Sequence, residues 1–290
     1  MFRRLLSVCL MFFRTDRKQP FCRRLFLSVL LLLGLMVSLS AAGKRDSLRI
    51  HATLVGVGAI NQLDTYMSPL EYTGTSLHFL QDNSRRASLL HRRLTLHHQV
   101  QATFSKTSSP GDHAHYWGAM AHWTVAARWR SVVSSRFYWE AGPQWGLHTG
   151  CLYHTRGGNN LAQGRLSTDL RLSSLASWSF PLSRRTATLC FQTDVQLIGL
   201  QFSPRYGESY YEMFELGHGG FHNVCVTSPF SAISSWHLLS LEIPFRTVSW
   251  RVGVAAGVTQ SHVNHLKTHD WTTTFLIGCV RRFALIPSRL

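Results

Sequence analysis

Apolar and polar residues alternate along most of the chain after residue 46. Successive side chains of a β-strand point to opposite faces, so a period of two predicts strands with one apolar and one polar face. In the stretch 249–259, one face holds Trp250, Val252, Val254, Ala256 and Val258, and the other holds Ser249, Arg251 and Thr259. The same pattern recurs in 93–104, 165–173, 187–196 and 271–280, which predicts an all-β protein.

The length of the alternating stretches separates two all-β architectures. Strands in soluble proteins average ~5–6 residues, whereas a tilted strand that crosses a bilayer needs ~9–11. Trp117 and Trp129 share one face of a single predicted strand, and at the usual rise and tilt they lie roughly 30 Å apart. That separation matches two aromatic belts at the membrane interfaces. A soluble β-sandwich is the alternative, because it shows the same alternation.

We therefore expect a single antiparallel up-and-down transmembrane β-barrel of about twelve strands, with eight or ten strands as the alternative. The expected strands are 48–61, 74–82, 92–105, 114–130, 134–149, 164–178, 185–202, 209–216, 221–228, 234–246, 248–260 and 269–284. Short turns alternate with longer polar connections, among them 62–73, 203–208 and 261–268. This alternation places both termini in the periplasm and makes 62–73 an outer loop.

An apolar run at 25–42 follows two arginines and ends in small residues. Ser40 and Ala42 occupy the −3 and −1 positions of a signal-peptidase site. We expect residues 1–42 to be a cleaved signal peptide and residues 43–290 to be the barrel, located in the outer membrane of a Gram-negative cell. An uncleaved anchor is the alternative, because such a run is just long enough to span a bilayer.

The net charge of the chain limits the classes of binding partner that we expect. The net charge is +16, and 23 basic and 13 acidic residues lie after residue 42. No basic cluster coincides with a helix, an aromatic RNA-binding strand or a finger motif, so we expect no nucleic-acid partner. Basic rims that face lipid phosphates fit a barrel better. The expected partners are outer-membrane lipids, lipopolysaccharide and the barrel assembly machinery, with the protein as a monomer.

Three stretches of the sequence resemble those of a known family. They are LDTYMSPLEYTG at 63–74, YGESYYE at 206–212, and the pair 251–253 and 275–278 near the C-terminus. Over about residues 48–285 they resemble a family of Bacteroidota-type outer-membrane proteins known only as a domain of unknown function. The resemblance implies an outer-membrane barrel and carries over no catalytic residue. Many such barrels end in an aromatic residue, whereas seven residues follow Phe283 here.

The segment 64–72 combines acidic and aromatic residues in an order unusual for a loop. By the strand pattern, several arginines face the barrel interior, where unpaired cations repel one another and are costly to desolvate. We expect the segment to fold inward as a plug that pairs one of its carboxylates with an arginine. The residues of this expected plug are Asp64, Tyr66 and Glu71 together with Arg165, Arg171 and Arg251. A ligand-contacting constriction is the functional alternative to a purely structural plug.

A second group of candidates lies near the expected rim. It consists of Tyr206, Glu208, Tyr211 and Glu212, with Ser209 and the histidines at 218 and 222 nearby. Rim enzymes use a serine, a histidine and an acid, but geometry rather than proximity defines such a triad. The same tyrosines suit an interfacial belt, so we assign no catalytic residue.

Metal ligands are the remaining possibility. His262, His265 and His269 share one expected loop, and His113 and His115 share another. Imidazole binds zinc or copper, but apart from Asp270 no carboxylate or cysteine stands at a fixed spacing beside these histidines, so we expect no metal and no cofactor. The spacing of Cys151, Cys190, Cys225 and Cys279 indicates no disulfide framework.

The expected function is that of an outer-membrane β-barrel. It is a narrow pore, or a small-ligand-binding or structural barrel, with no established reaction. The alternatives are a rim enzyme of the lipid or acyl hydrolase type and a barrel that acts in adhesion through its loops. The sequence leaves open whether the barrel conducts or is plugged.

Overall fold

The computed structural model describes residues 48–87, 93–156, 161–183, 185–214, 223–246 and 248–284. The expected signal peptide, residues 1–42, and the histidines at 218 and 222 lie outside these residues. No helix within the described ranges is long and apolar enough to cross a membrane.

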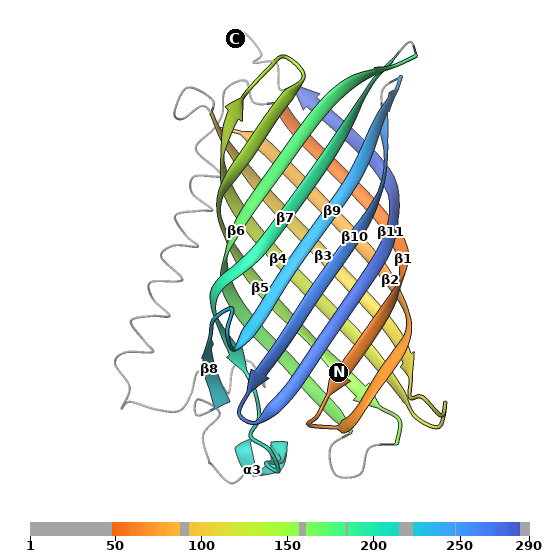
Figure 1. Cartoon of the computed structure of the whole chain (residues 1–290), viewed down its shortest axis with the longest axis vertical. Helices are drawn as coiled ribbons and strands as arrows, with labels where there is room; N and C mark the ends of the chain where they lie inside the picture. Colours follow the sequence, from red (N-terminus) through yellow and green to blue (C-terminus); the bar gives the residue numbers. More distant parts are fainter. Residues whose placement is uncertain are drawn as a thin grey trace, which may run out of the picture. The chain divides into compact units, whose positions relative to one another are not determined.

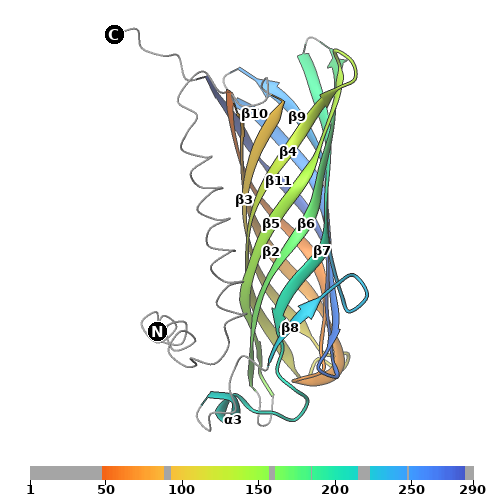
Figure 2. The ribbon, with the colours of Figure 1, turned by 90° about the vertical axis from the view of Figure 1, so that its left-hand side faces the viewer.

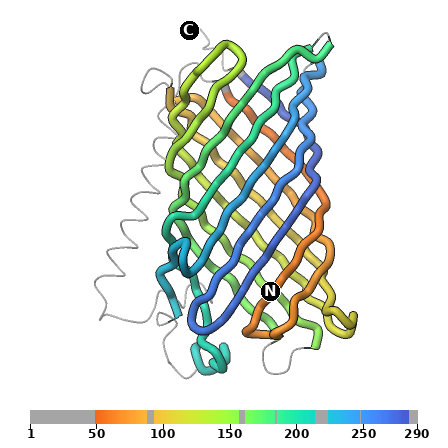
Figure 3. The backbone as a smooth tube through the Cα atoms, in the orientation of Figure 1, coloured from red at the N-terminus to blue at the C-terminus, as the bar shows by residue number. Residues whose placement is uncertain are grey.

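Ten long strands form a closed antiparallel barrel (Figure 1). They are β1 (Leu48–Asp64), β2 (Ser68–Arg86), β3 (Leu94–Ser108), β4 (His115–Val132), β5 (Phe137–His154), β6 (Ala162–Leu182), β7 (Arg185–Phe202), β9 (Ala232–Phe245), β10 (Val248–Val263) and β11 (Leu266–Ala284). The chain runs up and down from neighbour to neighbour (Figure 3), and β1 pairs with β11 to close the ring. A closed ladder satisfies the backbone hydrogen bonds that an open sheet would expose to lipid.

The two ends of the barrel differ. β1 begins and β11 ends at the same end, which we call the terminal end, because Leu48 pairs with Ala284. The opposite end carries the short helix α3 (Tyr210–Phe214) and the short strand β8 (Val224–Thr227), and we call it the α3 end (Figure 2).

Two of the twelve expected strands do not belong to the barrel wall. The segment 209–216 contains α3, and 221–228 contains β8, whose described pairing is with β7 at Gly199–Phe202. Twelve strands was therefore wrong, and ten, the alternative, is observed. Tyrosines favour strands, but Ser209 and Glu212 have the spacing of a helix cap, which decides this segment.

The expected long loops at 62–73 and 261–268 are also corrected. β1 reaches Asp64 and β2 starts at Ser68, so only three residues join them. Asn264 and His265 form the turn between β10 and β11, and both have positive φ values, of 52° and 63°. A two-residue type I′ turn requires this conformation at both positions. The hairpins are longer than a bilayer crossing needs and continue as strands at the α3 end.

The faces of the strands follow the alternation of the sequence. Phe191, Trp250 and Val254 are exposed on the outer face, whereas Gln192 and Asp194 are buried inside. The exposed tryptophans, with Tyr153, gather near the strand ends. Trp129, Trp139, Trp178 and Trp250 lie toward the terminal end, and Trp117, Tyr153 and Trp271 toward the α3 end. This arrangement confirms the expected two belts and the membrane-facing outer surface.

A small apolar cluster occupies one side of the lumen. It is built from β1, β2, β9, β10 and β11 and contains Ala52, Leu54, Leu80, Leu238, Ala255, Leu276 and Val280. The other side of the lumen, from β3 to β7, carries most of the long polar side chains. The interior is therefore packed with side chains from two walls of different character.

Candidate functional site: the barrel interior

A buried ion-pair layer crosses the lumen at the α3 end. Arg165 on β6 donates to the Asp64 carboxylate at 3.0 Å and also binds Asp270 on β11. Asp64 is completely buried. Gln62 donates to Asp270 at 2.9 Å, so this carboxylate has a second partner. β6 is thereby joined across the barrel to the neighbouring strands β1 and β11.

An aromatic layer lies beside this ion pair. Tyr72 and Tyr116 stack with ring centroids 3.8 Å apart, and both are buried. The hydroxyl of Tyr72 forms a 2.9 Å hydrogen bond with Nε2 of His154. The aromatic and ionic layers both lie in the lumen at the α3 end.

The two other residues of the segment 64–72 that were expected in the plug differ in burial. Tyr66, in the turn after β1, is buried and donates to the backbone carbonyl of Glu208 at 2.9 Å. Its pKa is raised above the usual value, mainly by burial, so its hydroxyl stays a donor. Glu71 is exposed and accepts from Asn61 at 3.1 Å. The structure thus brings Asp64 and Tyr66 inside and leaves Glu71 outside.

The rim candidates form a helix cap and its surroundings. Ser209 precedes α3, and Glu212 accepts from the Ser209 backbone nitrogen at 2.8 Å and from its hydroxyl at 3.1 Å. The Glu212 backbone nitrogen donates back to the Ser209 hydroxyl at 3.3 Å, which completes a capping box. Glu208 accepts from Asn223 at 3.1 Å. These contacts occupy the serine and both acids structurally.

The tyrosines of this rim differ in exposure. Tyr206 and Tyr211 are both well exposed. Tyr210, which the sequence reasoning did not select, points into the barrel wall, where its hydroxyl accepts a 2.8 Å hydrogen bond from the backbone nitrogen of Gly164. Burial raises the pKa of Tyr210 to about 12. Its hydroxyl accepts this hydrogen bond and holds α3 against β6.

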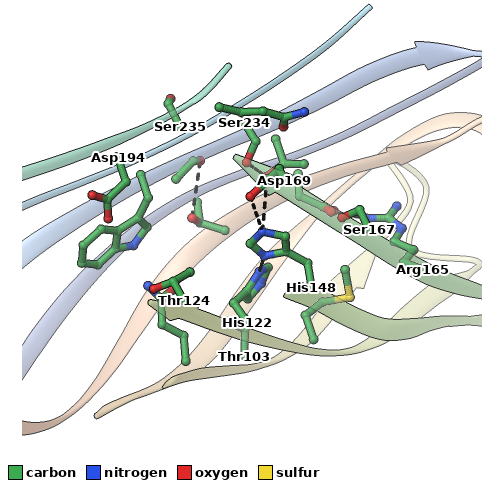
Figure 4. Close-up of a pocket in the computed structure, with 18 of the residues that line it drawn as sticks. Thr103, His122, Thr124, His148, Arg165, Ser167, Asp169, Asp194, Ser234 and Ser235 are labelled. Atoms are coloured by element: carbon green, nitrogen blue, oxygen red, sulfur yellow. Dashed lines mark hydrogen bonds and ion pairs between the residues drawn. The ribbon is translucent and has the colours of Figure 1, made fainter. Parts of the chain in front are cut away.

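A histidine pair occupies the middle of the lumen (Figure 4). Nδ1 of His122 lies 2.6 Å from Nδ1 of His148, and Nε2 of His148 lies 3.2 Å from Asp169. Arg171 binds Asp169 through Nε at 2.8 Å and Nη2 at 2.7 Å. Arg171 also donates to Ser234 on β9 at 2.9 Å. This chain of contacts crosses from β4 through β5 and β6 to β9.

The sequence allows the close approach within this group. A Cβ atom on Gly146 would lie 2.5 Å from the Asp169 carboxylate and 2.7 Å from Nε2 of His148. Such distances are too short for a side chain without displacement of its neighbours. Glycine at this position on β5 therefore leaves the room that the histidine and the carboxylate share.

A septum of polar side chains follows toward the terminal end. Arg128 Nη2 lies 3.5 Å from Asp194, and Arg128 donates through Nε and Nη2 to the Ser173 hydroxyl at 2.9 and 2.7 Å. Ser173 in turn donates to Asp194. Gln192 donates to the same carboxylate at 2.8 Å. We call Arg128, Ser173, Gln192 and Asp194 the septum.

A last ionic layer lies at the terminal end. Arg251 lies 3.1 Å from Glu242 and 3.5 Å from Asp82, and Arg282 also binds Glu242. Asp82 lies 2.5 Å from Nε2 of His97. The partners of Arg251 are therefore carboxylates on neighbouring strands, and those of Arg171 include Asp169. Neither arginine pairs with the segment 64–72 in these salt bridges.

The acids that balance the lumen were mostly missed from the sequence. Among the described residues, six arginines take part in its salt bridges, namely Arg128, Arg130, Arg165, Arg171, Arg251 and Arg282. Seven carboxylates face them, namely Asp64, Asp82, Glu140, Asp169, Asp194, Glu242 and Asp270. The near balance removes the expected repulsion among arginines. The alternation of apolar and polar residues could have identified these acids, because all of them lie at inward-facing positions of their strands.

In the described part of the barrel, two cavities lie between these layers. The larger, about 170 Å³, is lined by His78, Gln99, Thr103, His122, Thr124, His148, Arg165, Asp169, Arg171, Asp194 and Thr274 among others. The smaller, about 90 Å³, is lined by Asp82, Arg128, Glu140, Glu242 and Arg251 among others. Asp194 lines the first cavity and Arg128 the second, so the septum separates them.

The larger cavity carries polar atoms without protein partners. Nε2 of Gln99 and the hydroxyls of Thr124 and Thr274 are buried and have no hydrogen-bond partner among the described residues. All three residues line the cavity. Buried polar groups are normally paired with protein or with an ordered occupant. The cavity wall therefore has free hydrogen-bonding groups for a polar occupant.

Metal and disulfide sites are not assembled in the described part of the chain. No group of three histidine, cysteine or acidic side chains is placed there to hold a metal ion. Cys151, Cys190, Cys225 and Cys279 are all free thiols. His269 instead binds Asn61 at 3.0 Å and stacks on Trp271.

Comparison with known proteins places the chain in a family. The sequence pattern of one family matches residues 25–290. The chain belongs to that family, described as "Protein of unknown function (DUF3316)". Among curated proteins, none matches.

Several solved structures of outer-membrane proteins are similar to the chain. The translocator domain of the autotransporter NalP from Neisseria meningitidis is 11% identical, with a TM-score of 0.37, and the match covers 88% of this chain and 96% of that one. The outer membrane protease OmpT from Escherichia coli is 6% identical, with a TM-score of 0.42, and the match covers 82% and 97%. The closed ladder and apolar outer face themselves identify this family member as an outer-membrane β-barrel.

Proposed function

We propose that the protein is an outer-membrane barrel that holds a small polar molecule inside a closed lumen and does not act as an open diffusion pore. The septum carries this proposal. Its arginine and carboxylate are joined across the lumen and separate the two cavities. A ten-stranded ring is narrow enough for side chains to fill much of its interior.

The wall of the larger cavity supports the binding part of the proposal. Gln99, Thr124 and Thr274 each present an unpartnered polar atom there. A polar occupant that bonds them removes the cost of leaving such groups unpaired, on the order of 1–3 kcal/mol each. The ion-pair layer around Arg165 borders the cavity on the α3 side, and we infer that it retains the occupant on that side.

Orientation and assembly are part of the same proposal. Both described ends of the barrel sheet lie at the terminal end, which we assign to the periplasm, so that α3 lies on the cell surface. We expect the barrel assembly machinery to insert the chain as a monomer after removal of residues 1–42. Cross-linking of whole cells and the mass of the mature N-terminus test these points.

Vesicle swelling tests the closed lumen. Purified protein in phospholipid vesicles should give no faster swelling in arabinose than empty vesicles, because the septum and the Arg165 layer block the path. Native mass spectrometry of the same protein should show a retained small polar molecule. Rapid sugar entry through the wild-type protein would show that the lumen is an open pore.

A further inference from the structure

The ladder of the barrel wall is interrupted between β7 and β9. These strands pair from Thr188↔Glu242 to Val195↔Ser235, and no further pair joins them among the described residues. Beyond that point β7 pairs with β8 instead, over Gly199–Phe202. We call the boundary between β8 and the first three residues of β9, Ala232–Ser234, the seam. Among the described residues, no strand-to-strand ladder joins the wall at this place.

A bulge in β7 lies beside the seam. Leu170 pairs with Ile198 and Arg171 pairs with Gln196, so Leu197 is the extra residue. Leu197 and Ile198 both point outward as a result, with 53% and 49% of their surface exposed. A bulge bends a strand and re-aims its side chains. Here it places two adjacent apolar residues on the membrane side of the wall.

Further apolar side chains surround the seam on its outer side. Val226 on β8 is 69% exposed, and Phe230, in the connection to β9, is fully exposed. Ile233 at the start of β9 is also exposed. A contiguous group of exposed apolar side chains marks a surface that meets membrane or an apolar ligand. The seam therefore has an apolar margin that matches an acyl chain.

The register places the seam near a membrane interface. Trp271 pairs with Val258, Val258 with Ser235, and Ser235 with Val195. Trp271 belongs to the exposed aromatic residues of the α3 end, which mark an interface. The seam starts on this row and continues toward the α3 end. The polar head group of an amphiphile in this leaflet therefore lies beside the seam.

The larger cavity reaches the inner side of the seam. Gln196 and Gln201 of β7, Thr227 of β8 and Ala232–Ser235 of β9 line it. Gln196 donates to Thr227 at 3.0 Å, from β7 to β8, beside the seam. Neutral hydroxyls and amides therefore stand between the cavity and the apolar margin.

The charges behind the seam select the kind of head group. Arg171 is neutralised by Asp169, and Arg165 faces two carboxylates, Asp64 and Asp270. These five groups sum to one negative charge, so an anionic head gains nothing from them. The neutral donors and acceptors of the wall fit an uncharged, hydroxyl-bearing head.

We propose that the seam is a lateral entrance for a neutral amphiphile. Its hydroxyl-bearing head enters the larger cavity, and its single apolar chain stays on the outer wall against Leu197, Ile198 and Val226. This inference rests on the proposed closed, ligand-holding lumen and adds the class of ligand and its route. Entry through the wall also explains how a closed lumen is filled without opening either end.

Photolabelling tests the entrance in the intact mature barrel. The probe is a monoacylglycerol with a diazirine in its acyl chain, added to phosphatidylcholine vesicles that contain the protein. Adducts should concentrate on 197–198 and 224–233. Ala232→Trp fills the buried side of the seam and should lower this labelling about tenfold, the loss that ~1.4 kcal/mol of binding free energy produces. Leu239→Trp is the control, because Leu239 is exposed on the outer wall and pairs with Phe191 in the continuous ladder.

Folding of each variant is checked by its shift on unheated gels. If Ala232→Trp does not fold, Gln201→Leu serves instead, because it keeps the volume and removes a polar group from the cavity side. Even labelling around the barrel, or labelling that neither variant lowers, would overturn the entrance. A fatty-acid probe that labels better than the monoacylglycerol would overturn the neutral head. Either result leaves the closed lumen intact, whereas sugar permeability of the wild-type barrel removes the proposed function itself.

Discussion

Arg128 and Asp194 meet across the lumen with 3.5 Å between Nη2 and Oδ1, and their side chains are only 1% and 4% exposed. They stand on β4 and β7, which are not neighbours in the barrel. Their pair, together with Ser173 and Gln192, separates the two cavities. The most consequential contact of the lumen is thus made by two residues that the sequence analysis did not connect.

Removal of one septum charge should be costly. Arg128→Ala leaves Asp194 buried without its cation, and we expect a loss of on the order of 3–5 kcal/mol in unfolding free energy. Urea titration followed by the gel shift measures it. The double variant Arg128→Leu/Asp194→Leu should recover much of the loss, because no buried charge remains. Arg136→Ala, on an exposed turn, is the control and should change little.

Neutralising Asp64 should lower the stability of the ion-pair layer at the α3 end, whereas neutralising Glu71 should not. Asp64→Asn removes one of two carboxylates on Arg165, and Asp270 remains. We expect a loss of about 1.5–3 kcal/mol, the range for a hydrogen bond to a charged group. Glu71→Gln should stay within about 0.5 kcal/mol, because Glu71 is exposed. Equal losses in the two variants would contradict the placement of Asp64 inside.

The outer face should reject charge. Val254→Arg places a cation against lipid and should cost about 2–4 kcal/mol near the membrane midplane. Thr272→Arg, on the inward face beside the larger cavity, should cost less because the cation stays among polar groups. Refolding yields into phospholipid vesicles compare the two. Equal tolerance would show that the register of β10 and β11 is wrong.

The helix cap should act structurally. Ser209→Ala removes the hydroxyl that binds the Glu212 backbone and carboxylate, and we expect a local loss of about 0.5–2 kcal/mol. Limited proteolysis of whole cells should then cleave faster near α3 without change in the gel shift of the barrel. An esterase activity that disappears with Ser209→Ala would instead support the rim-enzyme alternative.

Strand positions followed from the sequence because burial forces a period of two. The stretches around Leu170, Phe191 and Val254 all carry that pattern, and their outward faces are confirmed. Membrane barrels repeat this rule in every strand, so ten of the expected twelve strands were found. The two errors fall where the rule does not apply, in α3 and in β8.

The interior was harder to derive, because it depends on contacts between distant strands. The inward phase of Asp82, Glu140 and Glu242 is visible in the sequence, but their pairing with particular arginines depends on which strands face one another. The bulge at Leu197 had a local signal, since two adjacent apolar residues interrupt the alternation there. The seam that accompanies it follows only from the observed pairing of β7 with β8.

Planar-bilayer conductance of the purified, folded protein tests the closed lumen most directly. Ion flow requires a continuous aqueous path, and in the proposed closed lumen the septum and the Arg165 layer both interrupt that path. The wild-type protein should give no stable conductance steps, whereas folded Arg128→Ala/Arg165→Ala should show at least transient steps. Stable steps from the wild-type protein, unchanged in the double variant, would contradict the closed lumen.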